Sequence, residues 1–260
     1  MGAEAVAIAR AGSYTVGDRT IELGALIERA ASGTCSYPPG AGLPEAPAAP
    51  RRSTRVEVVN ATTLAAARAL VDAGHDVAAL NFASARHPGG GFLNGARAQE
   101  ESLCRSSALY PCLVGDAMYE HRTDDGLYSD WVIYSPAVPV FRGDDGALLP
   151  APYPVSFLTC AAVNAKVARA RRSEDAILDA MTRRVDRVLA VAAAHGHDAL
   201  VLGAWGCGVF ANDPDAIAAR FAAALADRWR DRFAVVTFAI VDDWPDRRTI
   251  GPFEARLGLI

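Results

Sequence analysis

The chain has 260 residues, of which 51% are hydrophobic and 22% are charged, a composition typical of a globular protein with a sizeable core. The length suits one α/β domain with an accessory segment, or two small domains. A net charge of −4 excludes a global basic field that would draw the molecule onto nucleic acid or anionic lipid. We therefore expect no direct sequence-specific binding of nucleic acid and no membrane association.

The cysteines and the apolar stretches argue against a disulfide-bonded, a zinc-binding or a membrane-spanning protein. The five cysteines are Cys35, Cys104, Cys112, Cys160 and Cys207. Their odd number and scattered positions favour reduced thiols over a disulfide framework or a zinc site. No stretch approaches the roughly 18 apolar residues of a membrane span, and no amino-terminal signal pattern is visible, so we expect a cytoplasmic location. With no metal-ligand cluster, we expect chemistry without a metal or a cofactor.

The first 50 residues differ in pattern from the rest. A Gly-Asp pair at positions 17–18 separates two short runs of β-forming residues within residues 12–23, which predicts a hairpin. A helix is expected over residues 25–31. Residues 37–50 are rich in Pro, Gly and Ala and predict a linker or an extended wrap. We expect residues 1–50 to form an N-terminal accessory extension.

From Arg55 onward, apolar strands alternate with amphipathic helices. Strands are predicted over residues 56–59, 77–82, 132–134, 155–158, 199–202 and 233–241. Helices are predicted over residues 62–73, from about 98 until Pro111 closes the helix, after the N-cap Ser173, and after the pair Asp213–Pro214. This alternation favours a mixed or mostly parallel sheet covered on both faces, so residues 51–260 are expected to form one catalytic domain.

Three consecutive glycines follow the predicted strand 77–82, and two adjacent carboxylates follow the glycines. The segment from Pro88 to Glu101 reads PGGGFLNGARAQEE. Glycines can adopt positive φ and approach a ligand with no Cβ in the way. A carboxylate held nearby can donate or accept a proton at a bound acetal. This segment is the first candidate site, although acids at a helix start are also favoured by the helix dipole alone.

A second glycine-rich loop, residues 203–210, follows the predicted strand 199–202. Backbone N–H groups in such a loop, near the positive end of the next helix, can hold phosphate oxygens, and Phe210 could stack on a sugar or a base. The loop also fits the dinucleotide fingerprint GxGxxA, but the next strand ends near residue 242, too late for the acidic partner that the fingerprint needs. A tight structural turn is the other alternative.

The two loops together resemble the signature of bacterial-type poly(ADP-ribose) glycohydrolases. The resemblance covers roughly residues 52–243 and rests on Leu80–Ala85, the GGG–QEE segment, Ser107–Tyr110, Tyr134–Arg142 and Leu202–Asn212. It implies a macrodomain-like fold, a three-layer α/β/α sandwich with a mixed central sheet and a short N-terminal extension. It also implies hydrolysis of ribose–ribose O-glycosidic bonds in poly(ADP-ribose) from chain ends, release of ADP-ribose, and ADP-ribosylated proteins as substrates.

The resemblance further implies roles for individual residues. Glu101 would be the catalytic acid and base, and Glu100 and Gln99 would place the ribose hydroxyls. The other ligand contacts would come from Asn81 for the nucleotide, from Gly89, Gly90 and Gly91 for the ribose, and from Gly206, Cys207, Gly208, Val209 and Phe210 for the diphosphate and the distal ribose. The larger eukaryotic relatives carry Asp-Phe-Ala-Asn where this chain has Asn-Phe-Ala-Ser at 81–84. Contacts made by the Asp and the Asn of those relatives are therefore not expected from Asn81 and Ser84.

The adjacency of the two glutamates favours a single acid/base residue. Neighbouring residues on a helix point about 100° apart, so Glu100 and Glu101 do not resemble a glycosidase pair placed across one bond. To donate a proton at neutral pH, Glu101 needs a raised pKa. Two other functions stay open: removal of a single ADP-ribose from a protein side chain or nucleobase, and binding of ADP-ribose without catalysis.

Overall fold

The computed structural model describes residues 1–48, 53–121 and 123–258. A seven-stranded mixed sheet forms its centre. In spatial order its strands are β3 (Cys35–Tyr37), β6 (Val132–Arg142), β7 (Leu148–Cys160), β5 (Val77–Phe82), β8 (Ala199–Leu202), β9 (Val235–Ala239) and β4 (Arg55–Val59). The five strands from β7 to β4 run parallel, while β6 and β3 pair antiparallel with their neighbours. The predicted mixed sheet is confirmed.

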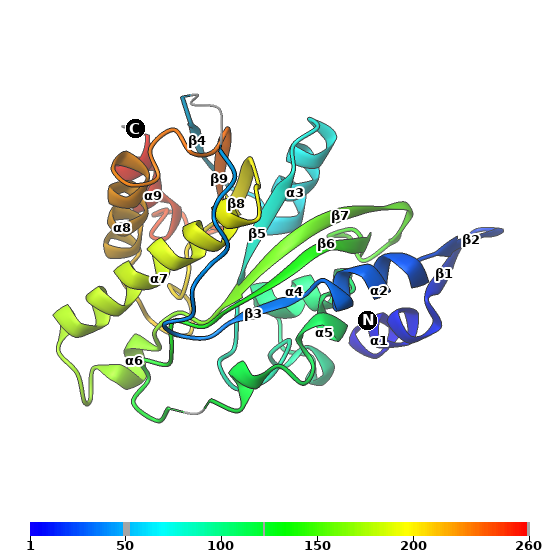
Figure 1. The fold of residues 1–260 in the computed structure, drawn as a ribbon, viewed down its shortest axis with the longest axis horizontal. Coiled ribbons are helices and arrows are strands. Elements are labelled where there is room, and N and C mark those ends of the chain that lie inside the picture. Colours follow the sequence, from blue (N-terminus) through cyan, green and yellow to red (C-terminus); the bar gives the residue numbers. More distant parts are fainter. Residues whose placement is uncertain (49–52, 122, 259–260) are drawn as a thin grey trace.

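Helices cover both faces of this sheet (Figure 1). One hydrophobic cluster joins the sheet to α1 (Gly2–Ala11), α2 (Gly24–Ser32), α3 (Thr63–Asp72), α4 (Gln99–Ser106) and α5 (Leu109–Leu113). The other joins it to α6 (Ala165–Ala168), α7 (Glu174–Ala194), α8 (Pro214–Ala226) and α9 (Ile250–Leu257). The three-layer α/β/α arrangement is therefore confirmed. None of the helices in the described ranges is both long enough and apolar enough to cross a membrane.

The predicted helix starts carry the side-chain caps that their sequences indicate. Thr62 accepts a hydrogen bond from the N–H of Ala65 at 3.0 Å and begins α3. Ser173 begins α7 in the same way, and Asp213 accepts from a backbone N–H at the start of α8. Each cap satisfies one of the N–H groups that the first helical turn leaves unpaired.

One prediction about a helix end was wrong, and two strands were predicted too short. Pro111 does not close the helix that begins near residue 98, because α4 already ends at Ser106 and Ser107 is extended and bridges to Val140. Pro111 lies instead in the first turn of α5, where its missing N–H leaves no helical bond unmade. The strands predicted over 132–134 and 155–158 are present but much longer, since β6 and β7 form one extended hairpin with two register shifts.

The N-terminal segment contains the predicted hairpin, β1 (Ser13–Val16) paired with β2 (Arg19–Glu22), and the predicted helix α2. Its last regular element, β3, pairs with β6 and supplies an edge strand of the central sheet. The end of the predicted linker and the predicted boundary between positions 50 and 51 lie outside the described residues. The first residue of the predicted linker, Tyr37, belongs to β3 instead. Residues 38–48 have no helix or strand.

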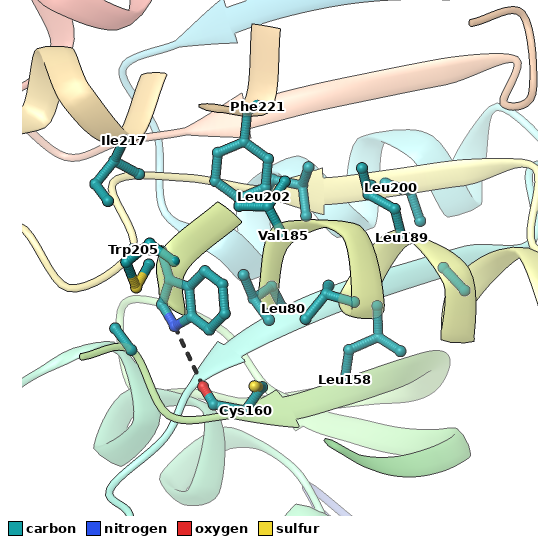
Figure 2. Packing of buried hydrophobic residues seen from close by; sticks show 14 of the residues in the cluster. Leu80, Leu158, Cys160, Val185, Leu189, Leu200, Leu202, Trp205, Ile217 and Phe221 are labelled. Carbon is teal, nitrogen blue, oxygen red and sulfur yellow. Dashed lines mark hydrogen bonds between the residues drawn. The ribbon is translucent and has the colours of Figure 1, made fainter. Parts of the chain in front are cut away.

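The second glycine-rich loop is anchored in the core by Trp205. Its side chain is fully buried, and its indole N–H donates to the carbonyl of Cys160 at 3.2 Å (Figure 2). Around the ring lie Leu80 of β5, Leu202 of β8 and Phe221 of α8. A large aromatic side chain held by packing and a hydrogen bond fixes the backbone that carries it. The loop that follows β8 therefore starts from a rigid point.

Candidate active site

A cleft of about 1150 Å³ opens where β5, β8 and β9 end. Both glycine-rich loops line it, together with the first turn of α4 and the start of α3. Ligands of open α/β sheets bind at this edge, beyond the carboxyl ends of the strands. The structure thus brings the two loops predicted from the sequence to one cleft that is large enough for a nucleotide.

The first loop passes so close to two carboxylates that only glycine fits at Gly90. Gly90 has a φ of +59°, and a Cβ placed there would lie 2.3 Å from Oε1 of Glu101 and 3.0 Å from Oε2 of Glu100. The two glutamates leave α4 in different directions, as the helix geometry requires, but their carboxylates both reach this glycine. The loop and the two acids therefore form one packed unit on the cleft wall.

Backbone N–H groups hold both oxygens of Glu101. Oε1 accepts from the N–H of Gly91 at 2.9 Å, and Oε2 accepts from the N–H of Ala98 at 3.0 Å. The second bond is the glutamate half of a capping box, so a glutamate at the third position of α4 stabilises the start of this helix. The side chain lines the cleft and is only 8% exposed. Its orientation is fixed by the loop that it faces.

Glu100 is the more deeply buried of the two acids, at 3% exposure. Burial raises the pKa of Glu100 to about 8, the N–H of Ser84 and the amide of Asn81 act against this shift, and the charge of Glu101 adds to it. The Ser84 nitrogen lies 2.6 Å from Oε2 of Glu100. The raised pKa favours the protonated form of Glu100 at neutral pH. From the sequence we expected a raised pKa on the acid, Glu101; the structure raises the pKa of its neighbour, Glu100.

Gln99 lines the cleft, but its side-chain amide makes its hydrogen bonds to other protein groups. Its Oε1 accepts from the N–H of Phe82 at 2.9 Å, and its Nε2 donates to the carbonyl of Leu80 at 2.7 Å and to the hydroxyl of Thr63 at 3.1 Å. These bonds join the first turn of α4 to β5 and to the start of α3. Gln99 thereby fixes where the two glutamates stand.

Two of the residues predicted to contact ligand lie behind the cleft wall. Asn81 is fully buried and donates to Thr159 at 3.2 Å and to Glu100 at 3.4 Å, and its Oδ1 has no hydrogen-bond partner among the described residues. Gly89, with a φ of +71°, is buried over the ring of Phe92 and the thiol of Cys104. Both residues shape the wall through their neighbours.

The second loop brings all five of its predicted residues, Gly206 to Phe210, to the cleft. Gly206 has a φ of +76°, and a Cβ there would lie 2.5 Å from the amide nitrogen of Asn212. That amide donates to the carbonyls of Val163 and Gly206, which holds the turn closed. Burial raises the pKa of the Cys207 thiol to about 12, so this cysteine is a neutral thiol and not a nucleophile.

Tyr128 is a residue of the site region that the sequence pattern did not reveal. Its ring lies 5.9 Å from the ring of Phe210, and its φ of +58° is unusual for a residue with a Cβ. The segment that carries it lies about 80 residues away from the second loop in the sequence, so no local motif connects the two. Tyr128 lies tilted against the aromatic ring that lines the cleft.

The dinucleotide-binding interpretation of the second loop requires an acidic residue that is free to bind a ribose hydroxyl, and Asp242 is not free to do so. Asp242, which follows β9, accepts backbone N–H groups from Trp244, Thr249 and Ile250. Its carboxylate is thus committed to the turn before α9. In the described part of the chain, no group of three or more His, Cys, Asp or Glu side chains could hold a metal ion.

Comparison with known proteins agrees with the geometry of the cleft. The family model of the microbial-type PARG catalytic domain matches residues 2–143. A search among curated proteins gives no match.

Several solved structures are similar over nearly the whole chain. One is poly(ADP-ribose) glycohydrolase (PARG) from Thermomonospora curvata, at 47% identity and a TM-score of 0.90, covering 98% of this chain and 97% of that one. The same enzyme bound to the inhibitor ADP-HPD is similar at 46% identity, with the same TM-score and coverage. The enzyme from Deinococcus radiodurans in complex with ADP-ribose matches at 42% identity and a TM-score of 0.84, covering 92% of this chain and 100% of that one. The chain belongs to the microbial-type poly(ADP-ribose) glycohydrolase family.

Proposed function

We propose that this protein hydrolyses the ribose–ribose O-glycosidic bonds of poly(ADP-ribose), one unit at a time from chain ends, and releases ADP-ribose. The observation that carries the proposal is the convergence of two buried carboxylates on Gly90 at the wall of a nucleotide-sized cleft. The similar enzymes that were solved with ADP-ribose and with ADP-HPD support a ligand of the same kind here.

In this proposal the ligand lies across both loops. The scissile ribose would contact Gly90 and Gly91, and the diphosphate would be held by the loop of residues 206–209, in which the N–H of Cys207 already donates to the carbonyl of Ala204. The distal ribose would stack on Phe210. Asn81, being fully buried, would act through Glu100 and not by touching the nucleotide.

Glu101 is the acid that we assign to the bond-breaking step. Its proton would pass to the leaving ribose oxygen as the bond from that oxygen to the anomeric carbon breaks, leaving an oxocarbenium-like sugar. The resulting carboxylate would then take a proton from the water that attacks this carbon. Burial raises the pKa of the neighbouring Glu100 and favours its neutral form. Neutral Glu100 would donate a hydrogen bond to a ribose hydroxyl.

We also propose roles for the two parts of the chain. Residues 51–260 would form the catalytic domain, and residues 1–50 would act as its extension. Strand β3, which joins the central sheet, supports an extension that is packed against the domain. ADP-ribosylated proteins are the proposed carriers of the substrate.

Incubation with poly(ADP-ribose) of defined length, followed by separation of the products by chain length, tests this proposal. Free ADP-ribose appearing first, with chains shortening by one unit, is the expected result. Early intermediate-length fragments would contradict attack from chain ends. Binding of ADP-ribose with no shortening would instead indicate removal of single ADP-ribose groups from another acceptor, or binding without catalysis.

A further inference from the structure

A series of hydrogen bonds begins on the N-terminal helix α1 and reaches the end of α4. Arg142, at the end of β6, is only 4% exposed. Its guanidinium donates to the carboxylate of Glu4 at 2.9 Å, to the carbonyl of Arg105 at 3.1 Å and to the carbonyl of Gly146 at 2.8 Å. Arg142 thus joins α1, the last turn of α4 and the tip of the β6–β7 hairpin.

The same series continues from Arg105 to the proposed acid. The Arg105 side chain, which is partly exposed, donates to the carbonyl of Ala96 and to the hydroxyl of Ser102. The N–H of Ala96 donates to the carbonyl of Gly91 at 3.2 Å, and the N–H of Gly91 donates to Oε1 of Glu101 at 2.9 Å. Each step between two residues from Glu4 to Glu101 is therefore a hydrogen bond, and within Arg105 the side chain joins the backbone carbonyl to the guanidinium.

Packing holds the same elements together. A Cβ at Gly2 would lie 2.5 Å from the carbonyl oxygen of Phe92, so α1 lies directly against the 3-10 helix η1 (Phe92–Asn94) that follows the three glycines. Hydrogen bonds of a buried guanidinium are shielded from water, and networks of this kind are rigid when all members are satisfied. The loop that carries Gly91 is held from α1 and from α4.

We propose that Arg105 and Arg142 are positioning residues, which set the place of the Glu101 carboxylate by holding the loop from Gly89 to Ala98, and that α1 takes part in this through Glu4. Their effect on turnover rests on the proposed function. Neither arginine lines the cleft next to the two glutamates. Arg142 is buried and lines a separate, smaller cavity, and Arg105 bonds to the loop backbone. Their loss should lower kcat and leave the affinity for ADP-ribose unchanged.

Arg105→Ala is the first test, because Arg105 is partly exposed and its truncation should leave the fold intact. We expect a fall in kcat of about tenfold, in the direction expected when a catalytic group is misplaced, with KM and the calorimetric Kd for ADP-ribose within twofold of wild type. Arg10→Ala is the matched control, since Arg10 is an exposed arginine of α1 whose side chain makes no hydrogen bond or ion pair with any residue in the described ranges. Equal kcat for both variants and wild type would overturn the proposal.

A double-mutant cycle separates a positioning role from a general structural one. If Arg105 acts through Glu101, Arg105→Ala has little further effect on the residual turnover of Glu101→Gln. Full additivity of the two losses would overturn the proposal. Arg142→Lys keeps the charge, but its compact ammonium lacks the planar fork of donors that reaches the acceptors on Glu4, Arg105 and Gly146, and it should reproduce the loss of kcat.

Amide hydrogen exchange gives a readout that needs no activity. In Arg105→Ala, the N–H groups of Ala96 and Gly91 should exchange at least tenfold faster, while amides of the central strand β5 keep their protection. Unchanged exchange at these two amides would contradict the proposal even if the protein hydrolyses poly(ADP-ribose). If exchange is faster in Arg105→Ala but the wild type does not hydrolyse poly(ADP-ribose), the positioning inference stands and the proposed function is wrong.

Discussion

The backbone N–H of Gly91 donates to the carboxylate of Glu101, with 2.9 Å between the nitrogen and Oε1. Gly89 and Gly90, which have positive φ, let the loop approach Glu101. Gly91, the next residue, then fixes the carboxylate of Glu101 by this hydrogen bond. A change in the path of the loop must move the carboxylate, and a change of the carboxylate releases the loop. The glycine run and the glutamate pair are one structural unit.

Gly90→Ala should nearly abolish turnover. The new Cβ would lie 2.3 Å from Oε1 of Glu101, and alanine disfavours the φ of +59° at this position. Displacing a catalytic group by about an ångström costs on the order of 10²-fold in rate. Steady-state kinetics should show this loss, while the matched variant Gly42→Ala, at a glycine with open space around it, keeps the wild-type rate. Near-normal turnover of Gly90→Ala would mean that the approach is not needed.

Glu100→Gln should change how stability depends on pH. Burial raises the pKa of Glu100 from 4.5 to about 8 in the folded protein. Between these values the unfolded chain has lost a proton that the folded protein keeps, so the free energy of unfolding falls as the pH rises, by at most about 1.4 kcal/mol per pH unit. Glutamine does not titrate. The Tm of the variant, measured from pH 5 to pH 8, should therefore rise relative to wild type, and parallel curves would contradict the raised pKa.

Phe210→Ala should mainly weaken binding. The ring lines the cleft and is supported by Tyr128. Loss of an aromatic stacking contact of about 1 kcal/mol or more, together with its buried area, predicts a roughly tenfold higher Kd for ADP-ribose. Calorimetric titration measures this directly. An unchanged Kd would show that Phe210 does not contact the ligand.

The parts of the fold that were predictable from the sequence are those set by local signals. The strand over 77–82 is an unbroken apolar run that leads into glycines, and it forms β5 with the same bounds. The caps Thr62 and Ser173 satisfy nearby backbone groups. Non-local pairing was not predictable: β3 exists because Cys35 pairs with Tyr134, almost a hundred residues away.

The same limit applies to the site. The identity of the two loops followed from residue types and spacing, and the cleft contains both. The burial of Asn81 and the raised pKa of Glu100 depend on how β5, α4 and the loop pack, which the sequence pattern does not encode locally. The link from Arg142 to Arg105 joins two segments that have no common motif.

The most direct test of the whole account compares wild type and Glu101→Gln with poly(ADP-ribose) of defined length, alongside calorimetric titration of both proteins with ADP-ribose. Glutamine keeps the size of the side chain but neither holds nor accepts the catalytic proton. We predict that wild type releases ADP-ribose, that the variant is slower by a factor of about 10²–10⁴, and that both bind ADP-ribose with similar Kd. Near-normal turnover by Glu101→Gln would contradict the assignment of Glu101 as the acid.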